Sequence, residues 1–454
     1  MVQSSTQESW EELQSLLLAG NSSAVEEYVD GLTSNELSRA ISRLSDAEQR
    51  HLLTILPAES AANLVEQIPD VQAVELFERL DAAHAAAIID EMPSSEQADI
   101  LGDLDVDDAD AILRHMDPEE AADARRLVDY EDDVAGGLMV TEFLQIPKDA
   151  TVEQVVQDLR ANADEYSDYD IQYGYVVDKT QHLSGVLRMR DLLLARGQAK
   201  IASLMITTPL SVQDVSPLDQ LIDFFDSHSF LGVPVVDPQG VLVGVVQRSA
   251  VDEASSDRQD SDYLKSQGIV GGEEIRSLPT WIRAKRRLSW LSVNILLNIM
   301  AASVIAVFQD TLSAVIALAV FLPIISDMSG CSGSQAVAVS LRELSLGLVR
   351  TNELLRVWIK EITVGLINGI ALGLLIAIVA YLWKGNTYLG LVVGSALALN
   401  TIVAVSIGGL IPLILKRFRI DPAIAAGPIL TTITDMCGFF FVLGFATALL
   451  DRLK

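Results

Sequence analysis

A twelve-residue spacing of apolar residues marks the N-terminal part of the chain. Between residues 32 and 117 an apolar residue recurs at every twelfth position, and each is followed by a residue that favours helix starts. The pairs are Leu32-Thr33, Leu44-Ser45, Leu56-Pro57, Ile68-Pro69, Leu80-Asp81, Met92-Pro93, Leu104-Asp105 and Met116-Asp117. Thr, Ser and Asp cap helix N-termini, and Pro fits the first turn. Each unit therefore predicts one helix of about two turns. A helix this short is only marginally stable by itself in water. We therefore expect the units to stack on one another and form an α-helical superhelix over roughly residues 10–130.

The pattern changes to short β-rich runs between about residue 137 and residue 250. The runs "YGYVVD", "HLSGVLRMRDLL", "LGVPVVD" and "VLVGVVQRSAV" alternate with the helical patterns "TVEQVVQDLRA" and "PLDQLIDFFDS". The order strand–helix–strand–turn–strand–helix occurs twice, which predicts two α/β modules with short sheets. A polar stretch over about 250–267 then predicts a connecting helix, followed by a short linker.

Long apolar runs dominate the chain from residue 288 onward. They predict five membrane-spanning helices at about 288–308, 312–341, 361–383, 388–415 and 424–450. The second run contains Pro323 and a Ser/Gly cluster, and we expect these to break it. The expected organisation is multidomain: an all-α repeat domain (1–135), a tandem α/β pair (136–250), a connecting helix with its linker (251–280) and an α-helical five-span transmembrane domain (281–454).

Charge is distributed unevenly between these regions. The formal net charge is -30, yet residues 281–454 hold 8 acidic and 14 basic residues, which leaves 54 acidic and 18 basic residues in 1–280. So acidic a soluble region argues against a nucleic-acid partner and fits a cation, although acidic surfaces also serve solubility alone. The start "MVQSSTQESW" has no basic or apolar leader pattern, so we expect no cleaved signal peptide and a cytoplasmic location for the first 280 residues.

Basic residues cluster at one end of the predicted spans. On that side are Arg283, Lys285, Arg286, Arg287, Arg342, Arg350, Arg356, Lys360, Lys416, Arg417 and Arg419, whereas the opposite side has only Lys384, Arg452 and Lys454. The positive-inside rule then places the N-terminus in the cytoplasm and the C-terminus outside the cell.

The sequence contains no motif typical of an enzyme. It has no phosphate-binding glycine loop, no Cys/His metal spacing and no recognisable pair of a nucleophile and its base, so we do not expect an enzyme.

One carboxylate, Asp435, lies in the last apolar run. It stands about eleven residues into the span, and a charge at that depth is tolerated where it lines water or binds a cation. Thr431 lies one turn before it, and Pro428 leaves a carbonyl without its helical partner. Carbonyl, hydroxyl and carboxylate oxygens suit a hard cation, so Asp435 and Thr431 are candidate metal ligands. The alternative is a neutral acid hydrogen-bonded to a neighbouring helix.

Two copies of this site suit a hydrated ion better than one. Mg²⁺ loses water reluctantly and usually keeps several water ligands. Since one carboxylate cannot hold such an ion alone, we expect a homodimer whose two-fold axis passes near Asp435. The small residues around Asp327 in "SDMSGCSGSQ" line a polar path or allow close helix packing. Glu361 is either a membrane acid or an interfacial residue paired with Lys360 or Arg356.

Acid clusters also occur in the soluble region. The stretch "DLDVDDAD" places Asp103, Asp105, Asp107, Asp108 and Asp110 together, and the connecting helix carries Asp252, Asp257, Asp260 and Asp262. Opposing carboxylates repel unless cations lie between them, which predicts that cytosolic Mg²⁺ joins the soluble domains and closes a pore. From these acids we take Asp103, Asp107, Asp252, Asp257, Asp260 and Asp262 as candidate metal ligands, with Glu59, Asp214 and Asp226 added. A solvated acidic face is the alternative.

The order of these regions resembles the MgtE family of magnesium channels along nearly the whole chain. The motifs "AGGLMVTEF", "LPIISDMSGCSGSQ" and "DPAIAAGPILTTITDMCG" are similar to the family's domain junction, second span and last span. The resemblance implies N-terminal helical repeats, paired cystathionine-β-synthase-type (CBS) modules, a plug helix and five spans. It also implies that Asp435 binds Mg²⁺ in the pore of a bacterial inner-membrane homodimer. The family often has Asn where this chain has Cys331, Ser334 and Gly427. Because the Asn that Gly427 replaces lies near the pore in the family, the resemblance adds Gly427 to the candidate metal ligands.

The resemblance further implies a nucleotide site in the CBS pair, with ATP as the expected ligand. In "GVLRMRD", Asp191 matches the residue that binds ribose, and Arg190 lies near the phosphates. The second module reads "GVVQRSA", with Ser249 and Ala250 where an Asp is expected, so we predict one site per chain. Tyr173 and Tyr175 either stack on adenine or belong to the core. Two other functions remain open: a proton- or ion-coupled transporter of Mg²⁺, Co²⁺ or Mn²⁺, and a nucleotide-sensing receptor without conduction.

Overall fold

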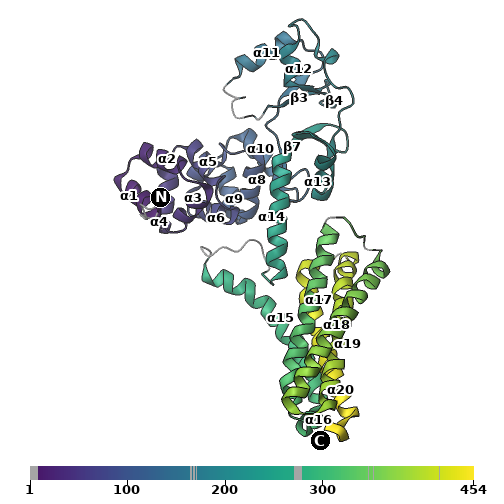
Figure 1. The fold of residues 1–454 in the computed structure, drawn as a ribbon. Helices are drawn as coiled ribbons and strands as arrows, with labels where there is room; N and C mark the ends of the chain where they lie inside the picture. The colour runs from purple at the N-terminus through teal and green to yellow at the C-terminus, as the bar shows by residue number, and fades with distance from the viewer. Residues whose placement is uncertain are drawn as a thin grey trace, which may run out of the picture. The chain divides into compact units, whose positions relative to one another are not determined.

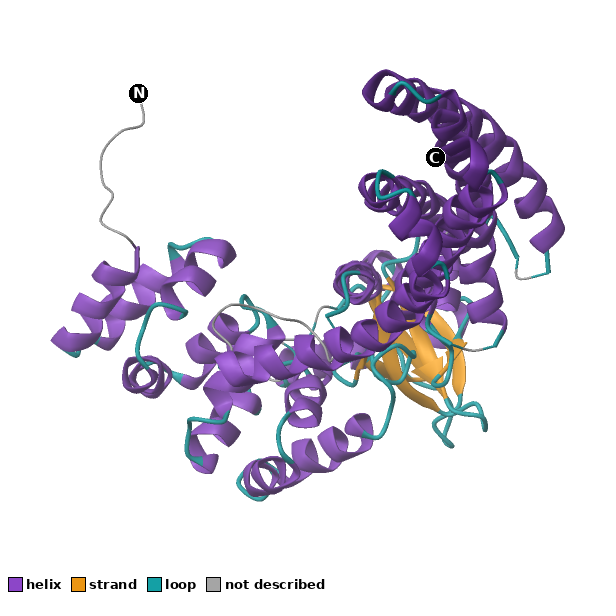
Figure 2. Ribbon diagram, turned by 90° about the horizontal axis from the view of Figure 1, so that it is seen from below, coloured by secondary structure: helices purple, strands orange, loops and turns teal. Residues whose placement is uncertain are grey.

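The computed structural model consists of two compact units, Met1–Arg258 and Gln259–Lys454 (Figure 1). The structure describes residues 9–163, 166, 169, 171–269, 279–345, 347–350, 352–418 and 420–453, with Glu119 by its backbone only. Most of the predicted linker between the connecting helix and the first span therefore lies outside the described residues. In Figure 2 the strands gather in one place, whereas helices joined by loops make up most of the other described residues.

Ten helices form the N-terminal part of the first unit over residues 9–128. They are α1 (Ser9–Ala19), α2 (Ser22–Asp30), α3 (Ser34–Ile41), α4 (Asp46–Ile55), α5 (Ala58–Val65), α6 (Asp70–Phe77), α7 (Ala82–Ile89), α8 (Ser94–Asp103), α9 (Val106–Leu113) and α10 (Pro118–Val128). From α3 to α10 the helices begin every twelve residues, so the predicted repeat is confirmed. Thr33 and Ser45 form capping boxes with the Glu three residues later, which satisfies backbone N–H groups at these helix starts.

The apolar residues of the repeat pack into one shared core. Leu44, Leu56, Ile68, Met92 and Leu104 are all buried in a single cluster that runs through the helical part. A two-turn helix buries too little surface by itself, so this shared core stabilises all the units together.

Two small sheets follow, and each contains one predicted α/β module. The strands are β1 (Met139–Val140), β2 (Gln145–Pro147), β3 (Tyr173–Val177), β4 (Leu183–Arg188), β5 (Val212–Gln213), β6 (Gly232–Val236) and β7 (Leu242–Gln247). The helices are α11 (Val152–Ala161), α12 (Met189–Leu194), α13 (Leu218–Ser227) and α14 (Arg248–Ser266), with a 3-10 turn at Ile201–Ser203. One sheet has the order β2-β3-β4 and the other β1-β7-β6-β5. In both, a parallel pair is followed by an antiparallel hairpin, as the repeated pattern predicts.

The strand β1 joins the sheet of the second module although it precedes the first module in sequence. The Ala-Gly-Gly turn before it brings the N–H of Gly136 to the carbonyl of Asp214 at 2.7 Å. A Cβ on Gly136 would lie 2.4 Å from the Tyr130 ring, and one on Gly137 would lie 2.5 Å from the Glu131 carbonyl oxygen. Only glycine fits both positions, which explains this part of the "AGGLMV" motif.

The connecting helix, predicted at about 250–267, is α14. Its first turns belong to the second module, because Val251 is buried among Leu218, Leu221 and Phe225. About two turns further on, Arg258 forms an ion pair of 2.9 Å with Asp219 at the start of α13. The start of α14 is therefore fixed to the second module.

The second unit contains the long apolar helices. They are α15 (Thr280–Val307), α16 (Gln309–Ala314), α17 (Leu318–Ser345), α18 (Leu354–Lys384), α19 (Thr387–Arg417), α20 (Pro422–Ala448) and α21 (Leu450–Leu453). By length and composition α15, α18, α19 and α20 are able to cross a membrane. The helix α17 has 28 residues and so also has the length to span, but it is more polar and does not belong to that set.

The predicted break in the second span is in the wrong place. The chain turns at residues 315–317, between α16 and α17, whereas Pro323 and the Ser/Gly cluster lie inside α17. Proline is tolerated in membrane helices where neighbouring helices and local adjustments satisfy the freed backbone group. Phe321 and Leu322 beside Pro323 are buried in the helix bundle, which supplies this support.

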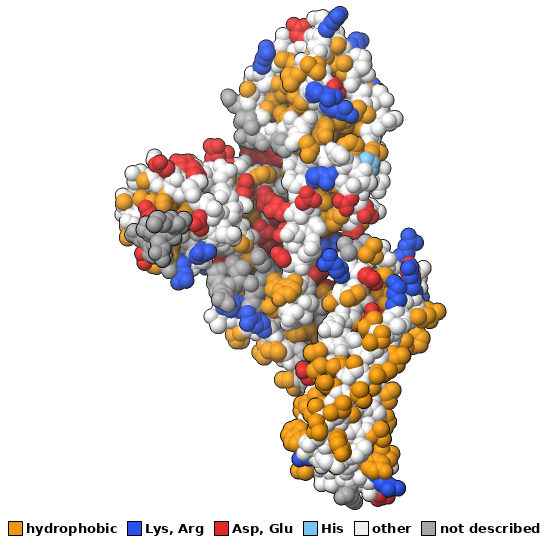
Figure 3. Space-filling model, viewed as in Figure 1, with side chains coloured by type: hydrophobic (Ala, Val, Ile, Leu, Met, Phe, Trp, Pro, Cys, Tyr) orange, Lys and Arg blue, Asp and Glu red, His pale blue; other side chains and the backbone are white. Residues whose placement is uncertain are grey.

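Helix α19 lies at the centre of this unit and packs against α17, α18 and α20. It approaches α18 through glycines: a Cβ on Gly394 would lie 2.5 Å from the carbonyl oxygen of Gly373. Small residues allow backbones to come this close in membrane helices. Hydrophobic side chains cover much of the surface over the long helices in Figure 3, as expected for a surface that faces lipid.

Candidate functional site

Asp435 lies in α20 and faces α17. Its side chain is half-buried, and the hydroxyl of Ser326 in α17 donates a hydrogen bond to Oδ1. Among the described residues the carboxylate of Asp435 forms no other hydrogen bond. A hydrogen bond to a neighbouring helix is therefore present, and it leaves the second carboxylate oxygen available to an ion or its water.

The other candidate ligands of α20 lie on the same open face. Thr431 is exposed and donates a hydrogen bond of 3.0 Å to the carbonyl of Gly427. A Cβ on Gly427 would meet no atom within 4 Å. Thr431 and Gly427 thus place a hydroxyl and a carbonyl along one line with Asp435, at steps of one helical turn.

Helix α17 exposes a polar stripe beside this face. Asp327, Cys331, Ser334 and Gln335 are all exposed, and a Cβ on Gly330 would meet open space. By contrast, Ser329, Ser332 and Gly333 on the opposite side of the helix are buried. The Ser/Gly cluster therefore divides into a packing side and an open polar side.

Glu361 forms no ion pair with Lys360 or Arg356 in the described part of the chain, so the interfacial alternative lacks its expected partner. Arg356 pairs instead with Glu353 at 3.1 Å, and the Glu361 side chain packs against Gly409 of α19, where a Cβ would lie 2.6 Å from Cγ of Glu361. This acid is thus inserted between two helices, and only glycine at position 409 leaves the space that it fills.

An acidic crevice is the main feature of the first unit. We use this name for Asp70 at the start of α6, three acids of α8 and two of α14: Glu96, Asp99, Asp103, Glu253 and Asp257. Figure 3 shows acidic side chains gathered over α8 and α14. Glu96, Asp99 and Asp103 follow one another at spacings of three and four residues, and Glu253 and Asp257 are four residues apart. These spacings place each set on one face of its helix.

Desolvation and, after it, repulsion between neighbouring carboxylates raise the pKa of several of these carboxyls. Partial desolvation, followed by repulsion from Asp70, Glu253, Glu66 and Asp257, raises the pKa of Glu96 to about 7. Desolvation, together with Glu96, Asp132, Asp70 and Asp103, raises the pKa of Asp99 to about 8. The pKa of Asp70 is raised by the same causes, with Asp257 the first of its charged neighbours. Because Asp70 and Asp99 remain open to solvent, cations can reach the charges that repel here.

The sequence located this crevice only in part. Of the predicted acids, Asp103 and Asp257 belong to it, whereas Asp107 is exposed in the first turn of α9. Asp252, Asp260 and Asp262 are exposed elsewhere on α14, Glu59 on α5 and Asp226 on α13. Asp70, Glu96, Asp99 and Glu253 were missed, because the prediction used local density of acids and not their spacing along a helix face.

Asp214 is buried and its carboxylate is hydrogen-bonded within the protein. It is 7% exposed, and its carboxylate accepts hydrogen bonds from the Tyr130 hydroxyl at 3.2 Å and from the Val215 N–H at 2.9 Å. Together with the bond from the Gly136 N–H to the Asp214 carbonyl, these contacts connect the segment after α10 and the Ala-Gly-Gly turn to the end of β5. Among the described residues, no group of three or more His, Cys, Asp or Glu side chains is close enough to hold a metal ion.

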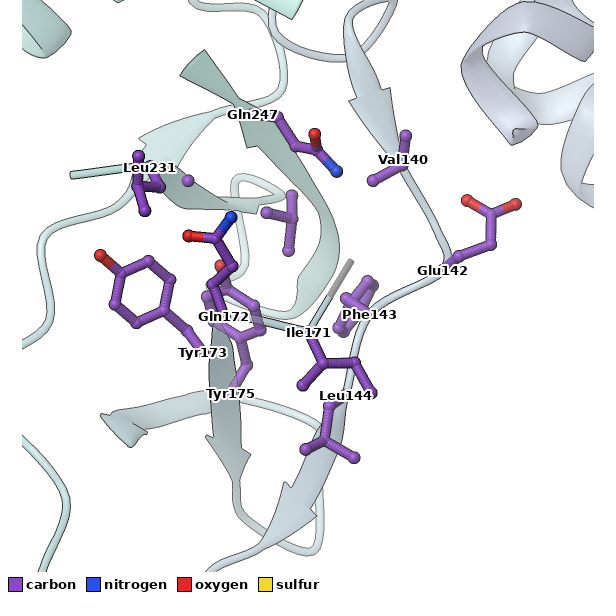
Figure 4. A pocket seen from close by; sticks show the side chains of 12 residues that line it. Val140, Glu142, Phe143, Leu144, Ile171, Gln172, Tyr173, Tyr175, Leu231 and Gln247 are labelled. Carbon is purple, nitrogen blue, oxygen red and sulfur yellow. The ribbon is translucent and has the colours of Figure 1, made fainter. Parts of the chain in front are cut away.

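The predicted adenine-stacking residues line a small pocket between the two sheets. Tyr173 and Tyr175 of β3 face residues of the second module, with Gln172, Leu231 and Gln247 around the same opening (Figure 4). Tyr175 is 3% exposed and packs edge-on against Phe143 at 5.8 Å, so it belongs to the core. The cavity volume of about 30 Å³ holds water but not an adenine ring as the side chains stand.

Asp191 and Arg190 do not line this pocket. They lie in the first turn of α12 and form an ion pair of 3.4 Å with each other. In the second module Ala250 takes the corresponding place. Before it, Arg248 donates hydrogen bonds to the carbonyls of Phe230, Phe225 and His228, which gives it a structural role. The two modules therefore differ where a nucleotide site is expected.

Three family profiles match the chain in the order of its domains. The profile described as divalent cation transporter matches residues 322–445, the MgtE intracellular N domain matches residues 32–133, and the CBS domain matches residues 133–197 and 201–257. A crystal structure of the soluble part of a magnesium transporter shares 26% identity and a TM-score of 0.50, covering 56% of this chain and 99% of that chain.

Curated relatives match over most of their length. The magnesium transporter MgtE of Bacillus subtilis is 34% identical over 328 residues, which are 72% of each chain. The magnesium transporter MgtE of Thermus thermophilus is 31% identical over 329 residues, again 72% of each chain. The aligned share and the matched domains identify the chain: it belongs to the MgtE family of magnesium transporters.

Proposed function

We propose that the protein is a Mg²⁺ channel in which Asp435 recruits hydrated Mg²⁺ to the conduction path. The observation that carries the proposal is a half-buried carboxylate in an apolar helix, fixed by Ser326 and aligned with Thr431 and Gly427 on an open face. A carboxylate with neighbouring hydroxyl and carbonyl oxygens matches the ligands that Mg²⁺ and its water shell prefer.

The polar stripe of α17 supports a homodimer. Asp327, Ser334 and Gln335 are exposed in a single chain, and polar side chains facing lipid are costly. A second copy placed against α17 and α20 would cover them and bring two Asp435 carboxylates to one path. Such a pair would hold a hydrated ion that one carboxylate cannot hold alone.

Mg²⁺ in the acidic crevice would close this channel. Carboxyls with pKa values of about 7 and about 8 release their protons when a divalent cation neutralises the repulsion. At low cytosolic Mg²⁺ the same charges repel, so α14 would separate from α6 and α8 and the pore would open. Like-charge repulsion between α8 and α14 supports this mechanism.

The proposed location is the bacterial inner membrane, with the N-terminus in the cytoplasm and the C-terminus outside. Support comes from Arg342, Arg350, Arg356 and Lys360, which precede or begin α18 at one end of the bundle.

We also propose one ATP site per chain at Asp191 and Arg190. A carboxylate accepts hydrogen bonds from ribose hydroxyls, and a guanidinium binds phosphate.

Flux measurements with matched carboxylate variants test the pore assignment. We expect Asp435→Asn to abolish Mg²⁺ uptake into proteoliposomes while the protein still folds and dimerises. Asp451→Asn, which neutralises an exposed acid of α21, is expected to conduct as the wild type does. Unchanged flux in Asp435→Asn would overturn the assignment. Uptake that a pH gradient drives without a Mg²⁺ gradient would identify a coupled transporter instead.

A further inference from the structure

Asn400 is a polar residue fully buried inside the helix bundle. It lies in the middle of α19, is 0% exposed and faces both α17 and α20. Primary amides are costly to bury unless they are hydrogen-bonded, and this cost is greatest among apolar membrane helices. Neither the charge map nor the motifs single out Asn400, so its role is to be found in its contacts.

The contacts of Asn400 fix the orientation of its amide. Nδ2 donates to the carbonyl of Thr434 in α20 at 3.0 Å and to Oγ of Ser329 in α17 at 2.8 Å. A carbonyl only accepts, and the Ser329 hydroxyl already donates to the carbonyl of Ile325 at 2.6 Å. The amino group must therefore face both partners, and one side chain joins three helices.

The bundle leaves a space shaped for this amide. A Cβ on Gly438 of α20 would lie 2.7 Å from Nδ2 of Asn400, so only glycine admits the amide at that point. The other end of the side chain is less well satisfied, because among the described residues Oδ1 of Asn400 has no hydrogen-bond partner. An apolar residue of similar shape would avoid that cost, so bundle stability does not explain why Asn stands here.

Both partners of Asn400 lie next to the Ser326–Asp435 pair. Thr434 immediately precedes Asp435 in α20, and Ser329 follows Ser326 by three residues in α17. The amide thus pins the two helix segments that bring Ser326 to the carboxylate. We propose that Asn400 is a positioning residue that sets the place of the Asp435 carboxylate in the ion path. This inference rests on the proposed function.

The first test replaces Asn400 by Leu, which has a similar size and no donor. Without the clamp, α17 and α20 are free to shift, and the half-saturating Mg²⁺ concentration is expected to rise about tenfold, as it does when the hydrogen-bond partners of metal ligands are lost. Discrimination against Mn²⁺ and Co²⁺, measured by competition in proteoliposomes, should fall as well. The midpoint of thermal unfolding should stay at the wild-type value or increase, because the orphaned acceptor is removed.

A purely structural role predicts a different result. It would lower the amount of folded protein and the maximal rate but leave the half-saturating concentration and the ion selectivity unchanged. That outcome for Asn400→Leu would overturn the proposal.

A second pair of variants keeps Asn400 itself intact. Gly438→Ala puts a methyl group against Nδ2 and should displace the amide, with the same rise in half-saturating concentration as Asn400→Leu. Gly444→Ala in the same helix is the matched control, because a Cβ there meets no atom within 4 Å, and wild-type transport is expected. Equal behaviour of the two glycine variants would overturn the proposal even if Asn400→Leu fails to fold.

The Asp435 variant separates failure of this inference from failure of the proposed function. If Asp435→Asn conducts normally, the pore assignment is wrong, and the positioning role of Asn400 is then wrong as well. If Asp435→Asn is inactive while Asn400→Leu and Gly438→Ala keep wild-type half-saturation and selectivity, the pore assignment stands and only the positioning role is excluded.

Discussion

The hydroxyl of Ser326 in α17 donates a hydrogen bond to the carboxylate of Asp435 in α20, although 109 residues separate the two in sequence. The bond connects the polar side of α17 with the acid of the last long helix. It also restricts the rotation of the carboxylate, because one of its two oxygens is held by the protein.

Ser326→Ala should weaken Mg²⁺ uptake without unfolding the protein. Loss of a hydrogen bond that orients a metal-binding carboxylate typically costs about tenfold or more in metal affinity. We expect a rise of that size in the half-saturating Mg²⁺ concentration, measured by uptake into proteoliposomes. Ser345→Ala, at the end of the same helix, is the control because, among the described residues, that hydroxyl bonds within its own helix, to the carbonyl of Arg342. An unchanged half-saturating concentration in Ser326→Ala would count against a role for this bond.

Without Mg²⁺, the first unit should lose stability as the pH rises. Glu96 and Asp99 have folded-state pKa values of about 7 and about 8, above those of the unfolded chain. Between about pH 4 and pH 8 the folded protein binds more protons, so the free energy of unfolding falls with increasing pH. Thermal unfolding in EDTA should therefore show a lower midpoint at pH 8.5 than at pH 6, and added Mg²⁺ should remove most of the difference.

The crevice variants test this pH dependence. Glu96→Gln with Asp99→Asn removes both titrating groups and should flatten the dependence of the unfolding midpoint on pH. Glu59→Gln neutralises an exposed acid of α5 and should leave the wild-type dependence. If the double variant loses stability with pH as steeply as the wild type, the crevice is not the source of the effect.

The end of α14 contacts the start of α20 through Lys265 and Asp421. Their side chains form an ion pair of 3.7 Å, and Asp421 also caps α20 by accepting a hydrogen bond from the Ala423 N–H. Asp421→Asn keeps the cap but removes the charge, so it isolates the ion pair. Because exposed ion pairs contribute about 0–1 kcal/mol, we expect at most about a fivefold rise in open probability at closing Mg²⁺ concentrations.

Lys265→Gln should reproduce the effect of Asp421→Asn, and the double variant should add nothing further, since the same pair is already broken. Patch-clamp recording in reconstituted membranes measures each open probability. Additive effects of the two changes would show that Lys265 and Asp421 act separately.

Asp191→Ala should abolish nucleotide binding in the CBS pair. The carboxylate is the expected partner of the ribose hydroxyls, and the second module offers Ala250 instead of a second acid. Isothermal titration with ATP is expected to give one site per chain for the wild type and none for the variant. Asp226→Ala, at an exposed acid of α13, should bind as the wild type does. Undiminished binding by Asp191→Ala would place the site elsewhere.

The sequence alone determined the succession of elements. The twelve-residue spacing located the starts of α3 to α10, because helix caps and apolar periodicity are local properties. Apolar run length likewise located the helices of the second unit, since a bilayer fixes how long such runs must be. The charge map and Asp435 also came from the sequence, because a carboxylate within an apolar run is conspicuous without any structure.

Only the tertiary structure decided which distant residues act together. The Ser326–Asp435 bond, the clamp at Asn400 and the crevice of α6, α8 and α14 all join segments far apart in the chain. Such contacts depend on helix rotation and packing, which the local sequence pattern leaves open. The turn between α16 and α17 illustrates the same limit: proline weakens a helix locally, but neighbouring helices decide whether it breaks.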